Sequence, residues 1–326
     1  ATPTSIPSPT ASPTTSPPPT LTATATPTPP RTATPVSTPG RRSRVESHAL
    51  DAIDHYSAAV ATMASQFDAA VLNQQYAYDT STVQSSIRKG TEDLRLARED
   101  AGSASTESVE EVLTIVESLR EYSRRSNGAY DTLVGALSNA SRARQLLRAE
   151  RFDPAATTFS QAATACETSS EEFQSARRQA ATILEAAPEE DRTAFEQFVT
   201  LAETARSYAE GFRVFAAGSV TYTRGVQRLG AGDAHYRNER YLPASEDYAT
   251  AVTRFETAEE RFGSREGVEV YNLGSQLTRS RCRSDRFAKV SNHFESVCTA
   301  ITDGNQQKAQ DQYEKAQADK ERIGNC

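Results

Sequence analysis

Apolar residues recur at helical spacing along nearly the whole chain after residue 43. The clearest stripe, over residues 44–76, alternates steps of four and three residues: Ala49, Ile53, Tyr56, Val60, Met63, Phe67 and Ala70. Such a stripe predicts a long helix that packs along one face. Similar steps occur between Val109 and Leu119 and between Phe195 and Phe212. The short alternation of apolar and polar residues that predicts a strand is absent, so we expect no sheet.

Turn-forming residues interrupt this pattern at several places. We place breaks near Tyr78–Asp79, Ala101–Ser105, Asn127–Gly128, Asp153–Pro154, Ala187–Pro188, Leu242–Pro243, Gly263–Gly267 and Asp303–Asn305. The sequence therefore predicts an all-α protein of about eight or nine helices. We expect the helices to form stacked hairpins or an elongated bundle.

Four glycines recur every seven residues in one predicted helix: Gly211, Gly218, Gly225 and Gly232. Glycine inside a helix costs about 1 kcal/mol relative to alanine, so a row of four needs a structural reason. Seven residues keep the glycines on nearly one face of the helix. We expect a neighbouring helix to approach closely along this face. The alternative is that the glycines near residue 230 only end the helix.

Part of the chain is duplicated. Residues 148–175 align without a gap to residues 237–264, and the match extends to segments 128–176 and 218–265. A partial third copy covers residues 296–323. Pro154 and Pro243 occupy matching positions, where proline favours the first turn of a helix. The duplication predicts a repeated unit of two helices joined by a short turn.

Aromatic residues and alanines share one spacing in these copies. The sets are Phe152, Ala155, Phe159 and Ala162; then Tyr241, Ala244, Tyr248 and Ala251; then Ala309, Tyr313 and Ala316, without the first aromatic. This spacing resembles the second helix of a tetratricopeptide repeat, which implies closely packed helical hairpins. The copies are 89 and 65 residues apart instead of 34 in tandem, so the resemblance implies no continuous groove and no peptide-binding residues. Hairpins of an unrelated helical bundle are the alternative.

The first 43 residues have a different composition. They hold 12 of the 15 prolines among Ser, Thr and Ala. This composition favours a disordered, polyproline-like stalk that spans on the order of 100 Å. It resembles O-glycosylated stalks, with Thr10, Thr14, Thr20 and Thr28 as acceptor candidates, and the spacers of prokaryotic surface lipoproteins. Because the chain begins with alanine, we expect that a signal peptide has been removed; an intracellular linker is the alternative.

The four cysteines predict two disulfides in a secreted chain. If helices over residues 268–302 and 306–323 fold back at Gly304, Cys282 and Cys326 each lie 22 residues from the turn. They then face each other, so we predict the pair Cys282–Cys326. This leaves Cys166 and Cys298 as the second pair. Because Cys166 aligns with the core position Phe255, a buried thiol is the alternative.

The remaining chemistry is sparse. Residues 41–326 hold 35 basic and 43 acidic side chains, which argues against a nucleic-acid partner. Arg279, Arg281, Arg283 and Arg286 form a basic patch that either binds an acidic polymer or is a solvated face. His48 and His55 fall just outside the apolar stripe, on a face that we expect to be solvated. We therefore predict no metal site at these histidines. The single sequon places an N-glycosylation candidate at Asn139.

No catalytic or nucleotide-binding motif is present, so we expect no enzyme and no cofactor. The sequence predicts a surface-tethered extracellular protein that binds a protein or surface polymer or has a structural role. A second copy of the chain is one candidate partner. We expect contact with a membrane only through an anchor that has been removed or lies upstream. A ligand-binding or sensory module with a small molecule between helices is the alternative, and a metal- or redox-active bundle is a third.

Overall fold

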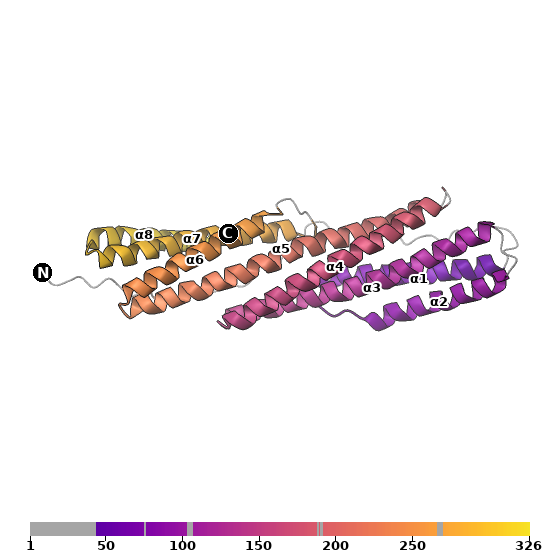
Figure 1. The fold of residues 1–326 in the computed structure, drawn as a ribbon, viewed down its shortest axis with the longest axis horizontal. Helices are drawn as coiled ribbons and strands as arrows, with labels where there is room; N and C mark the ends of the chain where they lie inside the picture. Colours follow the sequence, from indigo (N-terminus) through magenta and orange to yellow (C-terminus); the bar gives the residue numbers. More distant parts are fainter. Residues whose placement is uncertain (1–43, 75, 103–106, 188, 190–191, 266–269) are drawn as a thin grey trace. The chain divides into compact units, whose positions relative to one another are not determined.

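The computed structural model describes residues 44–74, 76–102, 107–187, 189, 192–265 and 270–326. These residues form eight α-helices and no strand, which confirms the predicted all-α fold (Figure 1). The helices are α1 (Arg44–Leu72), α2 (Thr80–Ala101), α3 (Glu107–Arg148), α4 (Phe152–Ala186), α5 (Arg192–Arg237), α6 (Tyr241–Gly263), α7 (Leu273–Thr302) and α8 (Gln306–Arg322), and the 3-10 turn η2 (Ile323–Asn325) follows. The predicted stalk lies outside the described residues.

The helices divide between two compact units. The N-terminal unit contains residues 44–137 and Ala165–Glu210, and the C-terminal unit contains Ser138–Thr164 and Gly211–Cys326. Each of α3, α4 and α5 contributes one segment to either unit. Within the described residues, no helix is long and apolar enough to cross a membrane.

In the N-terminal unit, α1 and α2 lie side by side, and their contact follows from the apolar stripe of α1. Every predicted stripe residue of α1 is buried except Ile53, which is partly exposed. Gly90 of α2 lies over the ring of Tyr56, where an added Cβ would come within 3.0 Å of ring carbons. The Tyr56 hydroxyl also lies 3.2 Å from the Thr91 hydroxyl. Glycine thus allows α2 to approach α1 at this point.

The predicted break at Asn127–Gly128 is wrong, because α3 continues through both residues. The helix buries Tyr122, Ala129 and Tyr130 on either side of the glycine. Burying two tyrosines stabilises the helix by more than the roughly 1 kcal/mol that one exposed glycine costs. Asn127 also accepts a hydrogen bond of 3.0 Å from the Tyr78 hydroxyl, which ties α3 to the segment before α2.

Three turns share one backbone conformation. The turn residues Glu150, Glu239 and Gly304 have φ values of 56°, 61° and 72°. At each turn, the next amide bonds to the carbonyl five residues earlier, over 2.8 to 3.0 Å: Arg151 to Leu146, Arg240 to His235 and Asn305 to Ala300. This is the Schellman arrangement, in which a left-handed residue ends a helix. The three turns occupy equivalent positions in the two duplicated segments and the partial third copy.

Replacing Glu239 with glycine is expected to stabilise the protein by about 1 kcal/mol, because a side chain in the left-handed region is strained. Calorimetry at neutral pH measures this as a higher Tm. The control Glu246→Gly, in the interior of α6, is expected to lower stability by about 1 kcal/mol. A Glu239→Gly variant that is less stable than the parent would contradict the assigned turn.

Helix length departs from the tetratricopeptide resemblance. That family places a whole two-helix repeat in 34 residues. Here α3, α4 and α5 alone have 42, 35 and 46 residues. The helix lengths therefore give no support to that resemblance, although the duplicated segments share their turn geometry.

Candidate functional site

The glycine row of α5 lies beneath aromatic rings of α6. A Cβ added at Gly218 would come within 2.5 Å of the Phe262 ring, and one at Gly225 or Gly232 within 2.8 Å of Phe255 or Tyr248. Gly211 is also buried. The rings, like the glycines, are seven residues apart, so each ring of one helix meets a glycine of the other. The row therefore serves close packing inside the C-terminal unit and is not an exposed docking stripe.

Aromatic rings of α7 pack on the same rings of α6. Tyr248 stacks on Phe294 of α7 with ring centroids 5.4 Å apart, and Phe255 stacks on Phe287 with centroids 5.2 Å apart. Both pairs have an interplanar angle of 22°. Two rings of α6, Tyr248 and Phe255, thus contact both the glycines of α5 and the aromatic rings of α7.

One acidic side chain enters this aromatic core. The Tyr248 hydroxyl donates a hydrogen bond of 2.8 Å to the carboxylate of Asp233. Burial raises the pKa of Asp233, although this hydrogen bond and the charges of Lys320 and Arg237 act in the opposite direction. Burial and the neighbouring carboxylate also raise the pKa of Tyr248. The tyrosine therefore stays protonated and acts as a donor.

Asp233→Asn is expected to raise the Tm at pH 7 by roughly 2–4 °C. A raised pKa means that folding favours the protonated acid, so Asp233 stabilises the fold below about pH 4, and this stabilisation is lost as the pH rises. Asparagine keeps an acceptor for Tyr248 without the charge. The gain should therefore vanish near pH 3 in thermal melts. A gain of equal size at both pH values would mean that the charge of Asp233 is not its source.

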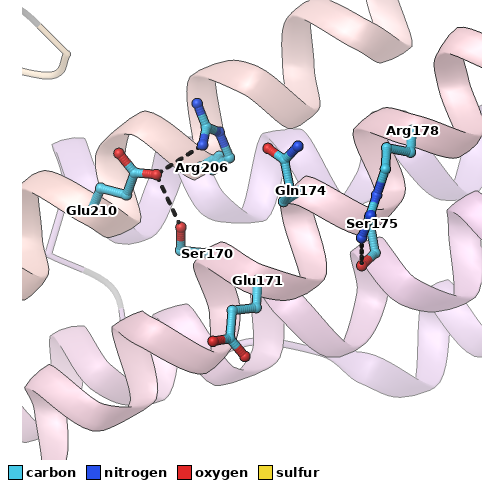
Figure 2. A pocket seen from close by; sticks show the side chains of 7 residues that line it. All are labelled: Ser170, Glu171, Gln174, Ser175, Arg178, Arg206 and Glu210. Atoms are coloured by element: carbon cyan, nitrogen blue, oxygen red, sulfur yellow. Dashed lines mark hydrogen bonds and ion pairs between the residues drawn. The ribbon is translucent and has the colours of Figure 1, made fainter.

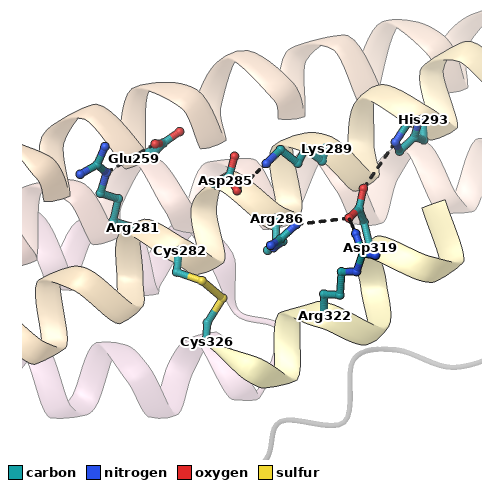
Figure 3. A network of polar contacts seen from close by, with 10 residues as sticks. All are labelled: Glu259, Arg281, Cys282, Asp285, Arg286, Lys289, His293, Asp319, Arg322 and Cys326. Carbon is teal, nitrogen blue, oxygen red and sulfur yellow. Dashed lines mark hydrogen bonds and ion pairs between the residues drawn. A yellow bond between two sulfur atoms is a disulfide. The ribbon is translucent and has the colours of Figure 1, made fainter. Parts of the chain in front are cut away.

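The disulfide joins Cys282 of α7 to Cys326, the pair that the hairpin register predicts (Figure 3). Helices α7 and α8 lie side by side, and the bond fixes the end of the chain against α7. The Cα atoms of the two cysteines are 5.8 Å apart, as disulfide geometry requires.

The structure corrects the second predicted pair, because Cys166 and Cys298 are both buried thiols. Cys166 lies in the N-terminal unit, at the position that Phe255 occupies in the duplicated segment. Cys298 belongs to a core cluster of the C-terminal unit, together with Tyr236, Tyr248 and Phe294. Each thiol thus fills an apolar core position in a different unit. Burial raises the pKa of the Cys298 thiol to about 12, so it is unreactive at neutral pH.

The four arginines of α7 do not form one cationic surface. Arg281 faces Glu259 of α6 at 3.5 Å, whereas Arg286 faces Asp319 of α8 at 3.4 Å (Figure 3). Arg279 bonds to the Ser275 carbonyl, and Arg283 is exposed. Arg279, Arg283 and Arg286 are spaced at i, i+4 and i+7 and so share one side of α7, whereas Arg281 is two residues from Arg279 and points in another direction.

Asp319 is the centre of a charged cluster between α7 and α8. Its carboxylate lies 3.4 Å from Arg286, from Arg322 and from Nε2 of His293. The other ring nitrogen of His293 lies 2.8 Å from the side-chain oxygen of Gln312. We did not predict this cluster, although Asp319 follows the buried residues Ala309 and Ala316 at helical spacing and so falls on the inner face of α8.

Both histidines of α1 lie against α2, where we expected a solvated face. Nε2 of His48 is 3.7 Å from Asp100, and Nε2 of His55 is 3.5 Å from Asp93. The two pairs are seven residues apart on each helix, and their order is reversed on α2 because α1 and α2 run in opposite directions. In the part of the chain that the structure describes, no three His, Cys, Asp or Glu side chains group together as metal ligands would.

An open groove of about 450 Å³ lies between α4 and α5 of the N-terminal unit. All of its lining residues are polar or charged: Ser170, Glu171, Gln174, Ser175, Arg178, Arg206 and Glu210. Figure 2 shows Arg206 and Glu210 near one end and Gln174 and Arg178 toward the other. No motif marks these residues in the sequence. They come from two helices, and only the tertiary structure brings them together.

The hydrogen bonds in the groove leave donors and acceptors available. Glu210 accepts a bond of 2.9 Å from Arg206 and one of 3.4 Å from the Ser170 hydroxyl. Arg178 donates to the Ser175 hydroxyl over 3.1 Å and is otherwise exposed. The Glu171 carboxylate is also exposed. This lining is chemically suited to a polar partner that hydrogen-bonds along the groove.

The two units differ sharply in charge. The sequence ranges of the N-terminal unit hold 12 basic and 25 acidic residues, a net charge of −13. Those of the C-terminal unit hold 21 basic and 18 acidic residues from residue 138 onward, a net charge of +3. The groove therefore belongs to a strongly acidic unit, whose field attracts cationic groups.

Of the glycosylation candidates, only Asn139 lies in the part of the chain that the structure describes. Asn139 lies within α3 and is partly buried, whereas acceptor sequons usually lie in surface loops. Its glycosylation stays a prediction. Thr10, Thr14, Thr20 and Thr28 lie outside the described residues.

Comparison of the chain with protein-family models, with curated proteins and with solved structures found no match. The function must therefore be argued from the geometry of the chain itself.

Proposed function

We propose that this protein is an extracellular, surface-tethered helical protein that binds a protein or polymer carrying cationic groups. The polar groove between α4 and α5 is the contact site. The protein carries no catalytic role in this proposal.

The groove carries the proposal. Its seven polar lining residues match a hydrated, hydrogen-bonding partner, and the net charge of −13 on its unit favours a cationic one. A site for an apolar small molecule is normally lined mostly by hydrophobic side chains. The lining of this groove thus gives no support to the alternative of a small molecule between helices.

Two features support an extracellular location. Disulfides persist in oxidising compartments, and Cys282 is bonded to Cys326. The first 43 residues have the composition of a stalk. A membrane-impermeant amine reagent added to intact source cells tests the location, because Lys89, Lys289, Lys308 and Lys315 are exposed. Labelling that appears only after cell lysis would contradict it.

Glu171→Lys is expected to weaken binding to the isolated surface fraction of the source cells by about tenfold, since it reverses a charge in the groove. Co-sedimentation of the purified full chain with that fraction measures the affinity. The control Asp54→Lys makes the same change of charge at an exposed position on α1. It should alter binding by much less. Equal losses in both variants would show that net charge, and not the groove, determines binding.

A further inference from the structure

Helix α8 is held to the C-terminal unit by few buried residues. Only Ala309, Ala316 and Asp319 of its 17 residues are buried, whereas α7 buries eleven of its 30 residues. Partly buried side chains of Tyr313 and Ile323 add to this contact. Apart from Ala318, the remaining residues of α8 are polar or charged. Segments with little buried apolar area open first in native proteins, so α8 is the weakest element of its unit.

Two restraints compensate for this small contact. One is the Cys282–Cys326 disulfide at the end of α8 (Figure 3). The other is the Asp319 carboxylate, which faces Arg286 and His293 of α7. Both cysteines are partly exposed, so a reductant in solution can reach the bond. The aromatic contacts between α6 and α7 involve no residue of α8.

We propose that the Cys282–Cys326 disulfide is a redox latch that keeps α8 on α7. A dithiol reductant opens it by thiol–disulfide exchange. The dithiol supplies two electrons and two protons, the sulfur–sulfur bond breaks, Cys282 and Cys326 become thiols, and the reductant becomes a cyclic disulfide. Helix α8 then leaves α7, while α5, α6 and α7 remain folded on their glycine and aromatic contacts.

The surface that opening uncovers is the face of α7 that α8 contacts. The Tyr313 ring lies against Phe294 of α7, with centroids 6.1 Å apart, and this contact is lost when α8 leaves. Gln312 likewise leaves His293. Phe294 keeps its stacking contact with Tyr248, so α7 stays in place. Reduction of the disulfide therefore exposes one face of α7.

Hydrogen exchange of the full chain tests the latch. Reduction with dithiothreitol is expected to speed exchange of the α8 amides by about tenfold or more. The amides of α6 and of α1 should keep their rates. The double variant Cys282→Ser/Cys326→Ser should show the same fast exchange in α8 without reductant. Adding Asp319→Asn to it should speed α8 further, because the second restraint is then weakened.

The amides of α6 report whether the rest of the C-terminal unit stays folded, and Cys166 reports on the N-terminal unit. Cys166 is a buried thiol of the N-terminal unit and should resist alkylation by a maleimide after the latch opens. Unchanged α8 exchange in the reduced protein would overturn the proposal, because α8 would then be held without the disulfide. Faster exchange in α6 would also overturn it, because the whole unit would be unfolding.

Discussion

Phe255→Ala is expected to destabilise the C-terminal unit by about 3–5 kcal/mol, the usual cost of removing a buried ring. The Phe255 ring fills the space above Gly225 and stacks on Phe287. Its edge also meets Tyr222, with centroids 5.5 Å apart. Because glycine has no side chain that can move into the space, the cavity should collapse poorly. Urea unfolding followed by circular dichroism measures the loss.

The matched control is Leu242→Ala on the same helix. Leu242 is 66% exposed, so its removal should change stability by less than about 0.5 kcal/mol. A Phe255→Ala variant that loses no more than this control would refute the layered packing of α5, α6 and α7.

Gly218→Ala is expected to lower stability by about 1–3 kcal/mol, although alanine is the better helix former. The new Cβ would lie 2.5 to 2.9 Å from carbons of the Phe262 ring, a distance that real contacts do not reach. That ring is only 2% exposed and also lies against Phe215, so it has little freedom to move. Thermal unfolding by calorimetry shows whether the Tm of the variant falls or rises.

The control Gly230→Ala on the same helix is expected to raise stability instead of lowering it. Gly230 is exposed, and a Cβ there meets nothing within 4 Å. It should therefore stabilise α5 by up to about 1 kcal/mol. Adding Phe262→Leu to Gly218→Ala should restore part of the loss, because the smaller side chain can yield. If both glycine variants were stabilised equally, the contact between Gly218 and Phe262 would be refuted.

The sequence predicted the helices well because their signal is local. The stripe from Ala49 to Ala70 lies on one face of α1, and the set from Phe195 to Phe212 is wholly buried. Breaks at Asp79 and Gly304 coincide with real helix ends, since Asp79 caps α2 and Gly304 adopts a left-handed conformation. The failed break at Gly128 shows the limit of this signal, because the burial of tyrosines on either side outweighs the propensity of one residue.

Contacts between elements were harder to predict. The pair Cys282–Cys326 followed from the sequence because both residues are equally far from one turn. The pairing of Cys166 with Cys298 rested on elimination alone, and the two thiols fill separate cores. Two of the four arginines of α7, Arg281 and Arg286, face carboxylates on different helices, α6 and α8. The groove between α4 and α5 has no local signal, because its lining residues come from two helices.

The sequence by itself determined the all-α fold, the positions of most turns, the glycine row and the register of the last hairpin. Each depends on spacing along one helix or across one turn, and such spacing is visible in the order of residues. The tertiary structure alone decided which ring covers each glycine, which carboxylate meets each arginine and histidine, and where polar side chains line a groove. These depend on how two helices cross, and the crossing follows from the packing of many side chains at once.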